Sequence, residues 1–172
     1  LALSLSVAGW KTILVDGHLR KGSRYKRLNE DVKQGLSDYI CFDAQLEDCI
    51  YATNWDLLHY IPCGTAKEES PVRMLCSVNM DIVMRRLQEE YDFVIIDVPS
   101  LNSSVDAQIL AVKADASILV TALHSSKRRC LEEAKKQLEQ AGGNLIGVVE
   151  NKVDMEEYKK YIKDYDYPAR KN

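Results

Sequence analysis

The sequence predicts an α/β fold in which a mostly parallel sheet carries helices on both faces. Strand-like and helix-like segments alternate along the 172 residues, without internal repeats. The strand-like segments are continuous apolar runs rather than runs with a period of two, which is typical of strands buried on both faces. Two of these runs also end in an aspartate, and open α/β sheets collect their ligand-binding groups at the carboxyl ends of the strands.

The first half of the chain opens with an apolar segment of helical pattern, "LALSLSVAG". Gly9 stands where this helix would end, because glycine readily takes the left-handed conformation of a C-terminal stop. No capping residue or acidic first turn precedes the segment, so we expect a helix that is cut in the middle, with further chain upstream. The elements expected over this half are a helix over 1–9, a strand over 12–16, short helices over 35–40 and 44–50, and a strand over 55–64 closed by Pro62 and Gly64.

The second half continues the alternation of helix and strand. Residues 71–90 carry apolar side chains at helical spacing, and Pro71 suits a first turn. The apolar residues of this predicted helix are Val72, Leu75, Val78, Ile82, Val83 and Leu87. The elements expected after it are a strand over 91–100, a helix over 104–114 capped by Ser103 or Ser104, a buried strand over 116–123, an amphipathic helix over 126–143 with a Gly-Gly stop, and a strand over 144–150.

Composition excludes several kinds of partner and site. The net charge of -3 gives no electrostatic reason to expect nucleic acid as the main partner. No run approaches the roughly 18 apolar residues of a membrane-spanning helix, so we expect a membrane role to come through a partner rather than by direct insertion. The five cysteines show neither C-x-x-C nor zinc-ligand spacing, and we interpret them as core or surface residues in a reducing cytoplasm.

Two aspartates close predicted strands. Asp16 ends the run "TILVD", and Asp97 ends the run "VIID". Carboxylates at the ends of strands in one sheet could hold Mg²⁺, directly or through water, beside a nucleotide phosphate. Each aspartate alone could equally cap a helix or lie in a loop, but their occurrence on two strands favours the metal-nucleotide interpretation.

These segments resemble motifs of the bacterial tyrosine kinases. "TILVDGHLRKG" is similar to the Walker A′ motif, which ends D-x-D-x-R, and "YDFVIIDVPS" is similar to the Walker B motif, in which apolar residues lead into D-x-P-P. "GLSDYI", "PCG", "SSVDAQIL" and "NLIGVVENKVD" then fall in the expected order. The resemblance implies a P-loop NTPase-like domain over 1–154, followed by a tyrosine-rich C-terminal tail over 155–172.

The resemblance implies an enzyme that uses ATP and Mg²⁺ to phosphorylate tyrosines in its own C-terminal tail. Asp16 would match the first Walker A′ aspartate, which organises Mg²⁺ and is a candidate acceptor of the tyrosine proton. Asp97 would match the Walker B aspartate, which holds the metal through water. Arg20 would match the arginine of the motif, although a surface salt bridge is an equally good interpretation. Asn151 would match an asparagine that contacts adenine.

The same resemblance implies a place in the cell. Kinases of this family act in capsule and exopolysaccharide biosynthesis, and they lie in the cytoplasm at the inner face of the membrane. A membrane-anchored polysaccharide co-polymerase recruits and activates them. We therefore expect such a partner, and a homo-oligomer at full length.

Four tyrosines lie close together in the tail and are the expected phosphoacceptors: Tyr158, Tyr161, Tyr165 and Tyr167. Each phosphate would add about -1.5 to -2 charges, and the repulsion between modified tails could dissociate an oligomer. The first three tyrosines are three and four residues apart, so they could instead form one face of a short helix.

The sequence departs from the family pattern at two places. The glycine-rich Walker A loop is absent, and the segment 1–9 resembles the helix that follows that loop. By analogy the sheet lacks a central strand, and we expect these residues alone to be inactive. The second departure is His18, which stands where the family has its second aspartate. Imidazole is a poor ligand for Mg²⁺, so we expect weakened activity, unless His18 only forms a hydrogen bond in a loop.

Other functions stay open. A degenerate, non-catalytic kinase-like module could bind the membrane co-polymerase, and both departures favour that alternative. A cell-division or partition-type P-loop ATPase shares the same motifs. "NKVD" at 151–154 matches the guanine-recognition pattern of GTPases, but "DVPS" lacks the glycine that a GTPase has after its second aspartate, which argues against that class.

Overall fold

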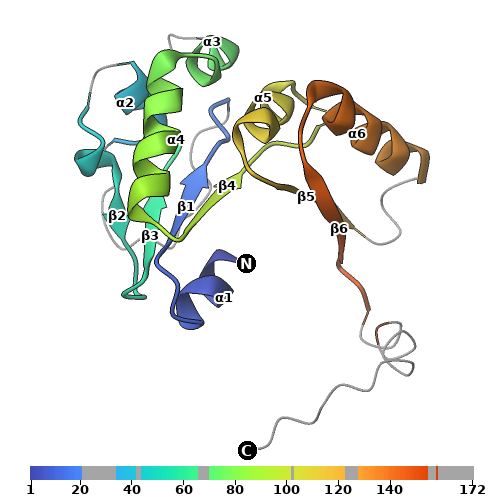
Figure 1. Ribbon diagram of the computed structural model, residues 1–172, viewed down its shortest axis with the longest axis horizontal. Helices are drawn as coiled ribbons and strands as arrows, with labels where there is room; N and C mark the ends of the chain where they lie inside the picture. The colour runs from blue at the N-terminus through green and yellow to red at the C-terminus, as the bar shows by residue number, and fades with distance from the viewer. Residues whose placement is uncertain are drawn as a thin grey trace, which may run out of the picture. The chain divides into compact units, whose positions relative to one another are not determined.

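The computed structural model describes residues 1–20, 34–41, 44–65, 70–101, 103–122, 128–154 and 158. The chain forms two compact units, Leu1–Lys113 and Ala114–Asn172 (Figure 1). Both contain parallel strands accompanied by helices, so the predicted α/β class with a mostly parallel sheet is confirmed. The domain boundary expected at residue 154 stays a prediction.

The first unit is built on a four-stranded sheet in the order β2-β3-β1-β4. Strands β1 (Thr12–Asp16), β3 (Leu58–Ile61) and β4 (Phe93–Asp97) are parallel, as expected, although β3 and β4 are shorter than the runs that predicted them. Strand β2 (Tyr51–Ala52) pairs antiparallel with β3 and was not predicted. Two residues are too few for a strand period to be visible in the sequence.

In the part of this unit that the structure describes, five helices and one 3₁₀ turn accompany the sheet. They are α1 (Ala2–Val7), α2 (Leu36–Ile40), the 3₁₀ helix η1 (Glu47–Cys49), α3 (Pro71–Leu75), α4 (Val78–Glu90) and α5 (Asp106–Lys113). The short helix expected over 44–50 is thus reduced to one 3₁₀ turn. Gly9 has φ +97° and follows α1 within two residues, as the predicted helix stop requires.

The single helix predicted over 71–90 is wrong, because the chain breaks into α3 and α4. Ser77 causes the break. Its hydroxyl donates to the Met74 carbonyl (2.7 Å) and accepts from the Met80 amide (3.2 Å), so it ends one helix and caps the next. The break changes the helical register, and Val78 and Ile82, two of the apolar residues whose spacing predicted one helix, are exposed.

The core of the first unit lies between the sheet and α4. Ile13 and Val15 of β1 are fully buried against apolar side chains of α4, including Val83 and Leu87. Helix α1 contacts β1, β3 and β4, and its buried Ala2 lies outside that cluster. Helices therefore cover both faces of the sheet.

The serine cap expected for the helix over 104–114 is also wrong. Helix α5 begins at Asp106, and the amides of Gln108 and Ile109 donate to the Val105 carbonyl. The Ser103 hydroxyl instead donates to the Ser100 carbonyl (2.7 Å), which closes the turn before the helix. The buried Ser104 hydroxyl has no hydrogen-bond partner among the described residues.

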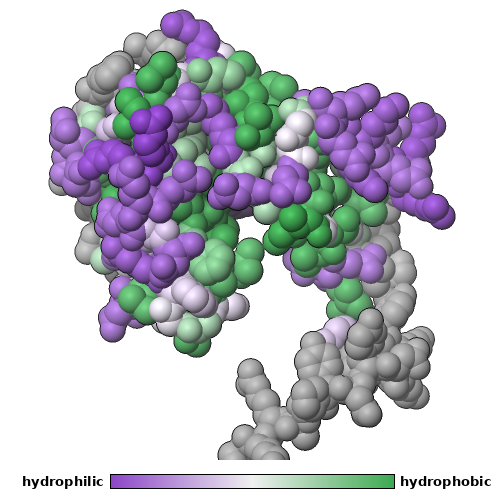
Figure 2. Space-filling view, in the orientation of Figure 1, coloured by the Kyte–Doolittle hydropathy of each residue, from purple (hydrophilic) through white to green (hydrophobic). Residues whose placement is uncertain are grey.

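The second unit contains a parallel pair of strands, β5 (Ser117–Ala122) and β6 (Leu145–Asn151), and helix α6 (Arg128–Ala141). Gly142, at φ +88°, ends α6 as predicted. The prediction of a buried strand over 116–123 is wrong for this unit, because Ile118 and Val120 are exposed. The outward face of α6 is strongly polar in Figure 2, and the described residues include no helix long and apolar enough to span a membrane.

Candidate functional site

Asp16 and Asp97 lie side by side at one edge of the first unit's sheet. The two residues are register partners at the carboxyl ends of the parallel strands β1 and β4. The Gly17 amide, directly after β1, donates to the Asp97 carbonyl (2.8 Å) and extends the pairing beyond the strand. The expectation that the two strands deliver their carboxylates to the same edge is confirmed.

The two carboxylates have different surroundings. Asp16 is 1% exposed. Its Oδ1 accepts the His18 amide (3.0 Å), and its Oδ2 lies 3.4 Å from the Tyr60 hydroxyl, which donates to it. The Asp97 side chain, in contrast, is 46% exposed. Asp16 is therefore anchored inside the fold, whereas Asp97 presents its carboxylate to solvent.

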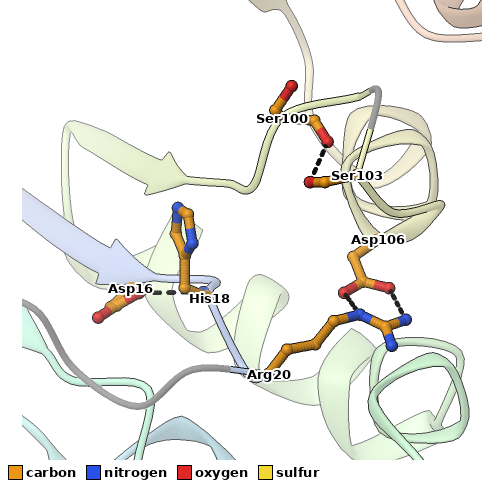
Figure 3. A network of polar contacts seen from close by, with 6 residues as sticks. All are labelled: Asp16, His18, Arg20, Ser100, Ser103 and Asp106. Carbon is orange, nitrogen blue, oxygen red and sulfur yellow. Dashed lines mark hydrogen bonds and ion pairs between the residues drawn. The ribbon is translucent and has the colours of Figure 1, made fainter.

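His18 stands beside the exposed carboxylate. Its Nε2 lies 4.0 Å from Asp97 Oδ2, and the side chain is 19% exposed. In Figure 3 the imidazole of His18 points away from the Asp16 carboxylate that binds its backbone amide. The backbone of His18 thus supports Asp16, while its side chain faces Asp97.

Gly17 allows β1 and β4 to stay paired beyond their ends. A Cβ atom at this position would lie 2.8 Å from the Asp97 carbonyl oxygen and 3.1 Å from a methyl group of Leu110 in α5. Neither the strand backbone nor the packed helix can retreat far, so a side chain here would push the segment after β1 outward. The glycine between Asp16 and His18 is therefore part of the site's geometry.

Arg20 reaches across to α5. Its Nε donates to Asp106 Oδ2 (2.7 Å), and its Nη2 donates to Asp106 Oδ1 (2.8 Å) (Figure 3). Nothing in the sequence predicts this pair, because the two positions lie 86 residues apart. Arg20 does form a salt bridge, which was the alternative interpretation, although its partner is a fully buried carboxylate rather than a surface one. Its match to the arginine of the motif stays a prediction.

Hydrogen bonds join the start of helix α2, in the segment "GLSDYI", to the loop "PCG" that follows β3. The Asp38 carboxylate accepts the Gly35 amide (2.7 Å) and the Thr65 hydroxyl (2.8 Å). Gly64, at φ +92°, passes so close that a Cβ atom would lie 2.5 Å from Asp38 Oδ2. Burial raises the pKa of the neighbouring Cys63 thiol to about 11, with the negative charge of Asp16 as the second cause. This loop therefore lies near the buried end of β1.

Asn151 and the tail belong to the second unit. Asn151 is the last residue of β6, and its side-chain oxygen accepts the Lys152 amide (2.8 Å). The Tyr158 amide donates to the Asp154 carbonyl (2.8 Å), and its side chain is exposed. The other three expected phosphoacceptors, Tyr161, Tyr165 and Tyr167, lie outside the described residues.

The side chains at this edge of the sheet suit a metal ion whose other ligands are water and substrate phosphate. Among the described residues, no three His, Cys, Asp or Glu side chains are grouped closely enough to hold a metal ion. Asp97 is open to solvent and could accept hydrogen bonds from metal-bound water, and Asp16 keeps lone pairs beyond its two hydrogen bonds. Mg²⁺ commonly keeps several waters and binds through one or two carboxylates plus substrate phosphates. The residues fit such an ion held partly through water.

The sequence is similar to those of several proteins named as tyrosine-protein kinases. The chain is 35% identical over 156 residues to "Tyrosine-protein kinase CpsD" of Streptococcus pneumoniae serotype 4, a match that covers 90% of this chain and 68% of that protein. It is 28% identical over 165 residues to "Putative tyrosine-protein kinase CapB" of Staphylococcus aureus, covering 96% and 72%. No family model matches the chain.

Solved structures show the same fold. The chimerical protein CapA2B2 superposes with a TM-score of 0.83 at 28% identity, covering 89% of this chain and 67% of that one. The septum site-determining protein MinD of Pyrococcus horikoshii, complexed with Mg-ADP, superposes with a TM-score of 0.67 at 28% identity, covering 86% and 60%. The fold is therefore that of MinD-like P-loop ATPases as well as of tyrosine kinases.

Proposed function

Because the chain belongs to the family of bacterial tyrosine-protein kinases, we propose that the full-length protein is an ATP- and Mg²⁺-dependent protein-tyrosine kinase. The observation that carries this proposal is the register pairing of Asp16 with Asp97 at one edge of the sheet. The fold shared with a MinD protein in complex with Mg-ADP supports the choice of nucleotide and metal. Bound Mg²⁺ would neutralise negative charge on the phosphoryl oxygens.

The two aspartates have separate tasks in this proposal. Asp97 is exposed and holds the metal's water ligands. Asp16 is buried, so it organises the same region through the His18 amide and its own remaining lone pairs. For Asp16 to receive the proton of a substrate tyrosine, the tyrosine would have to reach one of the remaining lone pairs of a carboxylate that is buried in the fold.

The proposed acceptors lie in the protein's own tail. Asn151 contacts the adenine, and Tyr158, Tyr161, Tyr165 and Tyr167 receive phosphate. Tyr158 is exposed, which a phosphoacceptor requires. Because each phosphate adds about -1.5 to -2 charges, phosphorylation of the tail would weaken contacts between copies in a homo-oligomer.

The proposed setting is capsule or exopolysaccharide synthesis and export. The kinase would act in the cytoplasm at the inner face of the membrane, held there by a membrane-anchored polysaccharide co-polymerase. Family membership supports this setting. Co-purification of the full-length protein with membranes only when the partner is expressed would support it, and equal recovery without the partner would contradict it.

A non-catalytic module is the second candidate, and His18 favours it. The imidazole occupies the side of Asp97 where the family has a carboxylate, at 4.0 Å between Nε2 and Oδ2. Replacing a carboxylate with imidazole removes negative charge from a site for a hard cation. In that case the protein would bind the co-polymerase without transferring phosphate. A positioning ATPase is the third candidate, favoured by the similarity to MinD.

One experiment separates these candidates. The full-length protein is incubated with ATP and Mg²⁺, with and without the cytoplasmic segment of the co-polymerase, and phosphotyrosine and free phosphate are both measured. Phosphate on residues 158–167 identifies the kinase. Free phosphate without phosphotyrosine identifies the ATPase, and neither product identifies the non-catalytic module. Phosphotyrosine found only elsewhere would overturn the acceptor assignment alone.

The isolated 172-residue chain provides a second test. We propose that it does not bind Mg-ATP, because no glycine-rich loop within it can supply backbone amides and a lysine to the phosphates. Calorimetry should give no binding heat at micromolar protein. A dissociation constant in the micromolar range would contradict this part of the proposal.

A further inference from the structure

The segment from Asp16 to Arg20 is fixed to β4 and α5 at both of its ends. At the first end, the Gly17 amide donates to the Asp97 carbonyl. Gly17 also lies so close to α5 that an added Cβ atom would be 3.1 Å from a methyl group of Leu110. At the second end, Arg20 binds Asp106 at the start of α5. His18 lies between these two attachment points, and the Leu19 amide donates to the Gly17 carbonyl (3.0 Å), closing a tight turn.

The two side chains of the Arg20–Asp106 pair differ in their exposure to solvent. Asp106 is 0% exposed, whereas the Arg20 side chain is 44% exposed. A buried carboxylate is costly unless its oxygens are paired, and Arg20 supplies one N–H to each oxygen in the two-pronged arrangement that a guanidinium favours. The hydrogen bond to Asp106 also raises the pKa of Arg20 above its ordinary value. The pair therefore fixes the direction of Arg20 and, through it, the end of the turn.

We propose that Arg20 and Asp106 are positioning residues of the site: their ion pair holds the turn at 17–20 so that His18 faces Asp97, and neither residue contacts nucleotide or substrate. The effect of this positioning on phosphate transfer rests on the proposed function, whereas the positioning itself does not. Motif resemblance matches Arg20 to the arginine of Walker A′, and the geometry gives that arginine a structural partner in Asp106. In Figure 3 the guanidinium is directed at α5 and the imidazole of His18 points elsewhere.

A second arginine in the same unit offers a matched control. Arg86 of α4 forms an ion pair with Glu47 of η1, which also joins distant parts of the chain. Both partners are substantially exposed, and their ion pair joins α4 to η1 rather than to the segment 16–20. Substitution of Arg86 removes an arginine–carboxylate pair from the surface and leaves the proposed site alone.

The test compares local opening with catalysis in full-length R20A, R20K, D106N and R86A variants. Amide hydrogen exchange is read at His18 and Gly17, whose amides bind Asp16 and Asp97, with Val83 in α4 as the internal reference. We expect R20A and D106N to speed exchange at both site amides by about tenfold or more relative to Val83. R20K should fall between them and the wild type, and R86A should match the wild type.

The kinetic measurement gives a separate result. R20A should lower kcat by about 10- to 100-fold, the range seen when supporting residues of a site are removed, while KM for ATP changes by less than about threefold. A raised KM with unchanged kcat would show that Arg20 contacts ATP and would overturn the proposal. Unchanged exchange at His18 in both R20A and D106N would also overturn it. An inactive wild type contradicts the proposed kinase, whereas the exchange data still decide the positioning role.

Discussion

The two units of the chain differ in how far their apolar side chains are buried. In Leu1–Lys113, the parallel strands and α4 enclose a fully buried cluster around Ile13 and Leu87. In Ala114–Asn172, Ala134 and Leu138 of α6 are the only buried apolar side chains among the described residues. The apolar side chains exposed on β5 and β6 are Ile118, Val120, Ile146, Val148 and Val149. Hydrophobic atoms remain uncovered beside α6 in Figure 2.

This difference explains where a precise polar site can exist. Asp16 and Asp106 are buried carboxylates, and both oxygens of each accept hydrogen bonds, from the His18 amide and the Tyr60 hydroxyl in one case and from Arg20 in the other. Asn151, in the other unit, is exposed, and its side-chain oxygen accepts the amide of the next residue. A two-stranded sheet is marginal on its own. The first unit therefore holds its polar side chains in fixed positions. In the second unit, the position of a polar side chain such as Asn151 depends on further contacts.

Matched valine substitutions test this comparison with the largest expected effect on stability. V83A removes two methyl groups from a fully buried site in α4, whereas V148A removes the same groups from a half-exposed position in β6. V83A should lower the free energy of unfolding by about 2 kcal/mol, and V148A by less than about 1 kcal/mol. Denaturant unfolding of the full-length protein measures both. A loss for V148A as large as that for V83A would show that β6 is covered at full length.

Removal of the cap between α3 and α4 should have a smaller effect. Ser77 satisfies the Met80 amide and the Met74 carbonyl, so S77A should cost about 1 kcal/mol of stability. S103A is the matched control, because its hydroxyl bonds one carbonyl in a turn and caps no helix. Equal unfolding midpoints for S77A and the wild type would show that Ser77 does not define the break.

The thiols of the first unit sharpen the contrast between core and surface. Burial raises the pKa of Cys49 and of Cys63 to about 11, so only about one thiol in a thousand is ionised at pH 8. Iodoacetamide should therefore modify the exposed Cys76 and leave both buried thiols intact, as peptide mass spectrometry would reveal. Rapid labelling of Cys63 in the folded protein would contradict the burial.

The same pKa values predict the direction of a pH effect. Both thiols bind their protons more tightly in the folded chain than in the unfolded chain, where the pKa has its ordinary value near 9. Their contribution to stability is complete below pH 9 and is lost as the pH rises towards 11. Unfolding midpoints should therefore fall across this interval, and C63A should reduce the slope.

The smallest predicted effect concerns His18. Restoring a carboxylate beside Asp97 adds negative charge for Mg²⁺, so H18D should raise autophosphorylation of the full-length protein by roughly a few fold. H18N is the control, because it changes the side chain without adding charge. No change in H18D would indicate that His18 acts only through its backbone amide, which binds Asp16.

The sequence alone predicted the class of fold and the meeting of two strand-end aspartates at one edge of the sheet, because both depend on short-range patterns. The apolar runs that end in Asp16 and Asp97 specify parallel strands, and the structure pairs those two residues, although β4 is only partly buried. The break at Ser77 was missed because one serine within a helical apolar pattern gives no signal until its side chain finds both neighbouring turns. The local hydrogen bonds of Ser77 decided that position.

Arg20 and Asp106 were missed as a pair for a different reason. They are far apart in the sequence, and only the folded chain brings α5 next to Gly17 at the end of β1, where the Asp106 carboxylate meets the Arg20 guanidinium. The Tyr60 hydroxyl near Asp16 follows the same rule, since β3 meets β1 only in the folded sheet. Exposure of β5 was also unpredictable, because continuous apolar runs indicate what a strand tends to bury and not what covers it.

The most direct measurement of the central claim is autophosphorylation of full-length D97N compared with D81N. Asp97 is the exposed carboxylate of the proposed metal site, and Asp81 is an exposed carboxylate of α4 that pairs with Lys113 away from it. With ATP and Mg²⁺ at fixed concentrations, D97N should lose about 10- to 100-fold of the phosphotyrosine signal, and D81N should match the wild type. Phosphorylation of D97N at the wild-type rate would contradict the claim that this edge of the sheet holds the metal-nucleotide complex.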